Sequence, residues 1–135
     1  MNKITPEEAK SLVDKLGPSD RIGYGTQQGC FTQTPVFPEN RRDICAVVRS
    51  VAPRASFGYD TLYLLWKNDN ILKDRRIHST NQSHRIYINA IQETDEQIVI
   101  HYQIDEVDPE FHSRKLKEKE ERIINKKDYG LRNEL

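Results

Sequence analysis

The sequence has few of the features that mark membrane proteins or disulfide scaffolds. Of its 135 residues only two are cysteines, Cys30 and Cys45. A membrane-spanning helix needs about 18 or more consecutive apolar residues. No run of that kind is present, so we expect no membrane contact. A chain of this length buries enough surface to fold without a disulfide or a metal. We expect one domain over residues 1–135.

The chain also lacks the local signatures of secretion, metal binding and phosphate binding. No apolar stretch follows Lys3, so the start does not resemble a secretory signal. We expect a cytoplasmic protein with reduced thiols, in which Cys45 is buried on an apolar strand. The four histidines include no H-E-x-x-H motif, and residues 23–29 match neither glycine-rich phosphate-binding pattern. The sequence therefore predicts no metal site and no cofactor.

Residues 1–16 carry the clearest local pattern. Thr5-Pro6-Glu7-Glu8 has a capping Thr, a Pro at the first helical position and a Glu three residues after the cap. Apolar residues then recur at helical spacing, namely Ala9, Leu12, Val13 and Leu16. Gly17-Pro18 ends the pattern. We predict a helix that ends at about residue 16 and packs through one face.

Residues 17–43 are rich in glycine and proline and show no clear periodicity. A segment of this length without structure of its own is uncommon in a compact domain, so we expect either short strands or a functional loop. Short strands would lie near Ile22 and Phe31. Phe31, Val36 and Phe37 are the side chains expected to anchor the segment to the core.

Residues 44–104 have the character of an antiparallel sheet. The run Ile44-Cys45-Ala46-Val47-Val48 is typical of a buried strand. Aromatic residues follow at positions 57, 59, 63 and 66, and core packing is a more ordinary use for them than stacking on bases. A second apolar segment near residues 61–67 and a polar one at 71–78 complete the first part of the predicted sheet.

The second part of the sheet can be given a register. Residues 85–91 and 98–104 both alternate between apolar and polar side chains. If Ala90 faces Ile98, every isoleucine of the pair except Ile91 lies on one face. The other face then presents four polar or aromatic side chains, namely Arg85, Tyr87, His101 and Gln103.

Residues 108–128 are predicted to form a long, charged helix. Asp108-Pro109 suits a helix start, and oppositely charged side chains recur four residues apart at Arg114–Glu118, Lys117–Glu121 and Glu118–Arg122. The predicted fold class is α+β, with an N-terminal helix, a curved antiparallel sheet of four or five strands and this C-terminal helix. In the predicted layout 1–16 is helix, 17–43 irregular, 44–104 sheet and 108–128 helix.

The net charge of zero hides an uneven distribution of charge. Residues 41–85 have nine Lys or Arg and four Asp or Glu, whereas residues 86–110 have no Lys or Arg and seven Asp or Glu. The basic stretch suits an anion such as phosphate or an RNA backbone. It equally suits an edge strand that Lys73, Arg75 and Arg76 protect from unwanted pairing, with the acidic stretch as a neutralising neighbour.

Two sets of side chains are candidates for an anion site. The first is the predicted sheet face with Arg85, Tyr87, His101 and Gln103, where a His could carry a proton and an Arg could hold developing charge. A solvated or helix-covered sheet face would carry the same residues without such a role. The second is the loop region with Arg75, Arg76, His78 and His84, which could also be an exposed polar turn.

The expected function is binding rather than catalysis, with an anionic ligand or a protein as the partner. One alternative is an RNA-binding protein or small ribonuclease that uses the Arg/His/Tyr face. Another is an inhibitor, immunity or accessory protein that uses the acidic hairpin around Asp95 and Glu96. No family resemblance favours one of these, and the oligomeric state stays open.

Overall fold

The computed structural model describes residues 3–16, 30–51, 58–81, 83–108 and 113–131. Within these ranges the chain forms one α-helix, α1 (Pro6–Leu16), seven strands and a short 3-10 helix, η1 (Lys126–Tyr129). No helix in the described part of the chain is long and apolar enough to cross a membrane. Residues 17–29, which include Ile22 and the glycine-rich stretch, lie outside the described residues.

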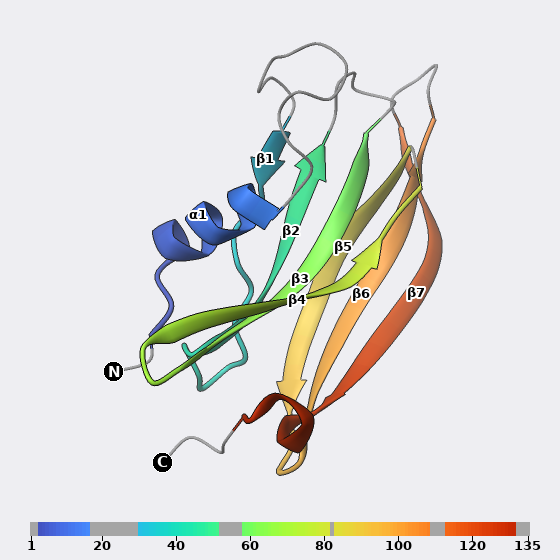
Figure 1. The fold of residues 1–135 in the computed structure, drawn as a ribbon. Coiled ribbons are helices and arrows are strands. Elements are labelled where there is room, and N and C mark those ends of the chain that lie inside the picture. Colours follow the sequence, from blue (N-terminus) through green and yellow to red (C-terminus); the bar gives the residue numbers. More distant parts are fainter. Residues whose placement is uncertain (1–2, 17–29, 52–57, 82, 109–112, 132–135) are drawn as a thin grey trace.

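The strands form two antiparallel sheets (Figure 1). Sheet A has the order β1-β2-β3-β4 and sheet B the order β5-β6-β7. The strands of sheet A are β1 (Cys30–Thr32), β2 (Ile44–Val51), β3 (Tyr59–Asn68) and β4 (Ile71–Ser79). Those of sheet B are β5 (His84–Glu93), β6 (Gln97–Val107) and β7 (Arg114–Asn125). The antiparallel pairing is as predicted, but the predicted α+β class is wrong: the described residues are mostly β, and two sheets with seven strands replace the predicted single sheet of four or five.

The main core lies between the two sheets. Alternate residues of each strand point into it, as the period of two in a strand requires. Sheet A contributes Ile44, Ala46, Val48, Leu62, Leu64 and Trp66, and sheet B contributes Ile86, Ile91, Ile98, Ile100, Tyr102, Ile104 and Ile124. Leu131, after η1, packs into the same core.

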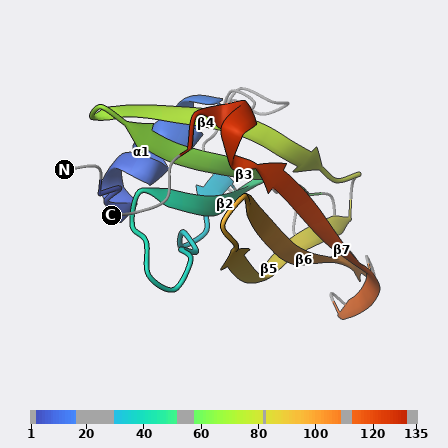
Figure 2. The ribbon, with the colours of Figure 1, turned by 90° about the horizontal axis from the view of Figure 1, so that it is seen from below.

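Helix α1 covers the opposite face of sheet A. Ala9 and Val13 pack against outward-facing residues of β2 and β3, among them Cys45 and Tyr63. Figure 2, seen along the layers, shows the order helix, sheet A, sheet B. Because β2 is buried on both faces, it reads as a continuous apolar run, and the predicted burial of Cys45 is confirmed.

The predicted start and length of α1 are also confirmed. The backbone N–H of Glu8 donates to Thr5 Oγ1 at 3.1 Å, and the N–H of Thr5 donates to Glu8 Oε1 at 2.7 Å. These are the two reciprocal bonds of a capping box. The helix ends at Leu16.

The predicted C-terminal helix is wrong. Arg114–Asn125 is strand β7, which pairs with β6, and only η1 follows it. Oppositely charged residues lie four apart at Lys117–Glu121 and side by side at Lys117–Glu118, and such a densely charged segment suits an exposed edge strand as well as a helix. Pairing with β6 stabilises the strand, because it places Ile124 opposite Ile98 and buries it in the core. Pro109 lies outside the described residues.

The predicted register of the β5–β6 hairpin is wrong by about two residues. The two strands occur where the alternation predicts them, but Ile88 faces Tyr102 and Ala90 faces His101. An irregularity between Ile88 and Ala90 shifts the later part of β5. A bulge of this kind inserts one residue and reverses the faces that follow it. It turns Ile91 into the core, where the regular alternation did not place it.

Candidate functional site

The cations of residues 41–85 that the structure describes do not gather on one surface. Several are bound by carboxylates at different places in the fold: Arg41 by Asp43 and Glu93, Arg49 by Asp14, Lys67 by Glu8 and Arg85 by Asp60. Arg42 lies over the Phe37 ring, 4.9 Å from its centroid. Ion pairs account for much of the excess positive charge that the sequence shows in this stretch.

Arg85 turns toward a buried carboxylate rather than toward solvent. Its Nη1 lies 3.0 Å from Oδ1 of Asp60, which is fully buried on β3. The second Asp60 oxygen, Oδ2, accepts from the Ile86 N–H at 2.8 Å. Gly58 leaves the space for this arrangement, because a Cβ there would collide with Arg85 Nη2 and lie 2.5 Å from the Val51 carbonyl oxygen. Arg85 thus joins the start of β5 to β3.

The second predicted set, Arg75, Arg76, His78 and His84, lies on β4 and at the start of β5. Arg75 lies opposite Leu64 and Arg76 opposite Tyr63, so these two neighbours project from opposite faces of β4. Arg75 lies over the Tyr129 ring at 5.3 Å, and the His78 ring lies 5.9 Å from the Tyr102 ring. β4 is an edge of sheet A, which agrees with the interpretation of its charges as edge protection. The acidic hairpin lies in the other sheet, not beside β4 as expected.

Tyr87, His101 and Gln103 share the outer face of sheet B, whereas His84, two residues before the core-facing Ile86, projects from the other side of β5. Tyr87 lies opposite Gln103, whose Nε2 donates to Asp105 Oδ1 at 2.7 Å. His101 Nε2 lies 2.8 Å from Gln92 Oε1. His101 Nδ1 lies 3.5 Å from Glu121 Oε2. His84 Nε2 is 3.5 Å from Lys117 Nζ. Tyr87, His101 and Gln103 therefore share one face of sheet B, whereas the Arg85 guanidinium turns away from them to Asp60.

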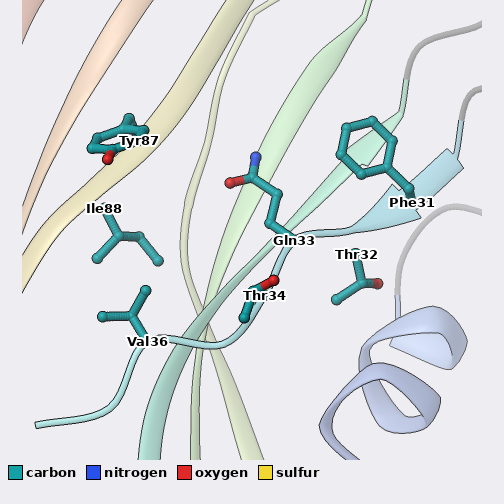
Figure 3. A pocket seen from close by; sticks show the side chains of 7 residues that line it. All are labelled: Phe31, Thr32, Gln33, Thr34, Val36, Tyr87 and Ile88. Carbon is teal, nitrogen blue, oxygen red and sulfur yellow. The ribbon is translucent and has the colours of Figure 1, made fainter. Parts of the chain in front are cut away.

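A groove of about 530 Å³ lies between β5, at Tyr87 and Ile88, and the segment of residues 31–36 (Figure 3). One wall comes from β1 and the segment that follows it, and the other comes from β5. Its lining residues are Phe31, Thr32, Gln33, Thr34, Val36, Tyr87 and Ile88. None of these seven side chains is charged, although 31% of the chain is charged.

Two aromatic side chains are exposed at this groove. Phe31 is 53% exposed and Tyr87 is 55% exposed. Gln33 extends between the walls in Figure 3, and its Nε2 donates to Ser50 Oγ at 3.3 Å. The groove therefore offers apolar surface together with hydroxyl and amide groups, which is the usual makeup of a binding pocket.

The groove follows from the unequal width of the sheets. Phe31 lies opposite Ser50 and Val36 opposite Ala46, so both share the core-facing side of sheet A. β5 packs over β2 and β3. The inner face of β1 and of residues 33–36 consequently extends beyond the edge of sheet B.

Sequence reasoning identified Tyr87 but placed it in a different set, and it missed the groove. The prediction that Val36 and Phe37 anchor residues 17–43 to the core is confirmed, because each packs against buried residues. The prediction for Phe31 is wrong, since a side chain 53% exposed is not a core anchor. The burial of Tyr63 and Trp66 confirms core packing for these two aromatic residues.

Buried titratable side chains lie away from the groove. Burial and the hydrogen bond to Glu120 raise the pKa of Tyr102 to about 12. Burial raises the pKa of the Cys45 thiol to about 12.

Within the described residues, no group of three or more His, Cys, Asp or Glu is placed to hold a metal ion. No family model, curated protein or solved structure matches the chain.

Proposed function

We propose that the chain is a binding protein whose site is the neutral groove between β1 with residues 33–36 and β5, and whose ligand is a protein partner. The observation that carries the proposal is the lining itself. A groove whose described lining has no charged side chain, in a chain of which 31% is charged, suits a ligand segment without charge. Half-exposed aromatic residues such as Phe31 and Tyr87 are common anchors at protein interfaces.

An anionic ligand has less support at this site. Phosphate or RNA needs cations that converge, and none is among the described residues that line the groove. Arg85, the cation nearest in sequence to Tyr87, is bound to Asp60. The RNA-binding and ribonuclease alternatives would instead use the outer face of sheet B, where His101 already lies between Gln92 and Glu121.

The inhibitor or immunity alternative is a special case of a protein partner. It differs only in the surface used, since Asp95 and Glu96 lie in the exposed turn between β5 and β6. Charge reversal at these two residues would weaken a partner that binds there. It would leave a partner in the groove unaffected.

A selection experiment tests the neutral chemistry of the site. A phage-displayed library of random peptides of about 10 residues, the length of a long strand, is panned against the immobilised protein. We expect enriched peptides that are rich in apolar and hydroxyl side chains and poor in charged ones. Enrichment of strongly acidic or basic peptides would contradict the proposal, and so would the absence of any enrichment.

A further inference from the structure

The free edge of β5 faces the groove with its backbone. Among the strands that the structure describes, β5 pairs with β6 alone. The His84 carbonyl accepts from Thr80 Oγ1 at 2.9 Å and the Ile86 N–H donates to Asp60 Oδ2, so both groups point away from β6. Backbone groups alternate in direction along a strand. The N–H and C=O of Ile88, the next residue in this series, therefore also point away from β6.

Ile88 is the position at which this edge meets the groove. Its side chain is one of the lining residues and packs against the core. Thr80 and Asp60 occupy the edge at His84 and Ile86. Within the part of the chain that the structure describes, no group outside sheet B is bonded to the Ile88 backbone. A donor and an acceptor are thus directed into the groove.

The opposite wall, formed by residues 31–36, is extended backbone that continues the inner face of sheet A. The N–H of Gln33 donates to Val48 O at 2.9 Å, and Val36 and Ala46 exchange backbone bonds at 2.9 Å. Phe31, Gln33 and Val36 therefore extend the inner face of sheet A. Residues 31–36 span up to about 20 Å if extended, which accommodates a strand of five or six residues. Sheet A has four strands and sheet B three, and the groove lies where a fourth strand of sheet B would lie.

We propose that the groove takes up one extended segment of a partner protein, which adds to the edge of β5 at Ile88 and makes sheet B four-stranded. This inference rests on the proposed function and adds the mode of binding. Main-chain hydrogen bonds supply affinity in strand addition, and alternate side chains supply specificity. The inward-facing side chains of the segment contact Val36 and Ile88 and are apolar, with a polar residue near Gln33. Because the lining is neutral, the segment carries no charge on that face.

Backbone methylation of a selected peptide tests the mode of binding. A peptide enriched in the library selection is synthesised with N-methyl groups on every second residue, in two complementary versions. An added strand bonds to β5 through one set of its N–H groups only. We expect one version to bind at least about 10-fold more weakly than the parent peptide and the other to bind nearly as well. We also expect the bound parent peptide to slow hydrogen exchange at the Ile88 amide.

The outcomes distinguish failure of strand addition as the binding mode from failure of the groove as the binding site. If Tyr87→Ala weakens binding but both methylated versions bind alike, the groove remains the site and strand addition is wrong. If Tyr87→Ala leaves peptide binding unchanged, the proposed function fails and the strand mode fails with it. If the protein alone forms dimers that Tyr87→Ala dissociates, the occupant is a second copy of this chain and the inferred partner is wrong.

Discussion

Phe31 and Tyr87 lie on opposite walls of one groove, although they belong to different sheets and are 56 positions apart in the chain. Each is more than half exposed. Neither is needed to fill the core, which Ile86, Ile100 and their neighbours already fill. Two exposed aromatic side chains on a neutral surface are costly for solubility and useful for binding.

The ion pair between Arg85 and Asp60 is expected to matter for stability. Asp60→Ala leaves the Arg85 guanidinium and the Ile86 N–H without their partner in a buried site, and such losses cost about 3–5 kcal/mol. The free energy of unfolding is measured by urea titration. Asp74→Ala, on the exposed edge strand β4, is the control and should change it by less than about 0.5 kcal/mol. Equal effects of the two substitutions would show that the buried pair contributes nothing special.

The protein is expected to lose stability in acid. Burial raises the pKa of Glu93, but hydrogen bonds from Lys126 and Arg41 outweigh burial, and the pKa lies below its usual 4.5. The backbone hydrogen bond from Thr5 likewise lowers the pKa of Glu8. A lowered folded-state pKa gives stability that is present above pH 4.5 and is lost as the pH falls through the folded value.

Glu93→Gln tests this pH dependence. The variant should be less stable than the wild type at pH 7, and the difference should shrink as the pH falls below 4.5. Urea unfolding at a series of pH values measures it, with the exposed Glu39→Gln as control. A difference that is constant from pH 7 to the acid range would contradict the assigned role of Glu93.

The Cys45 thiol is expected to be unreactive in the folded protein. Burial raises its pKa to about 12, so almost no thiolate exists near neutral pH. In a Cys30→Ser background, labelling by iodoacetamide should be slow in buffer and rapid in urea. Rapid labelling of the folded protein would show that β2 opens more readily than its packing under α1 indicates.

Nucleic-acid binding is expected to be weak. Because Arg85 pairs with Asp60 and Arg75 and Arg76 project from opposite faces of β4, few cations act together. A fluorescent single-stranded RNA should bind without the steep salt dependence of a multi-phosphate site. Tight binding that falls steeply with salt and is lost in Arg75→Ala with Arg76→Ala would support the RNA-binding alternative instead.

The elements that sequence predicts well are those defined by local chemistry. The bonds between Thr5 and Glu8 cap α1 as their spacing indicates, and the alternation of residues 85–91 and 98–104 indicates strands that do form. Strand β7 is the counterexample, because its alternating charges fit a helix as well as an edge strand. Its pairing with β6 depends on a contact that local propensity does not contain.

The candidate site was harder to predict because its two walls come from different sheets, and their relative position depends on how the sheets pack. The alternation places Tyr87 on the polar face of β5 correctly, because the bulge after Ile88 reverses only the faces that follow it. Phe31 looks like a core residue in the sequence, but no strand of sheet B covers it. The groove arises from the difference in strand number between the sheets, and no short motif encodes that difference.

The most direct test compares two double variants in binding to the library-selected peptide. Phe31→Ala with Tyr87→Ala removes both groove aromatics, whereas Ile71→Ala with Leu116→Ala removes exposed apolar residues from β4 and β7. Fluorescence anisotropy of the labelled peptide gives Kd for each folded variant. The account predicts a Kd at least about 10-fold higher for the groove variant and an unchanged Kd for the control. Equal Kd values for the groove variant and the wild type would contradict it.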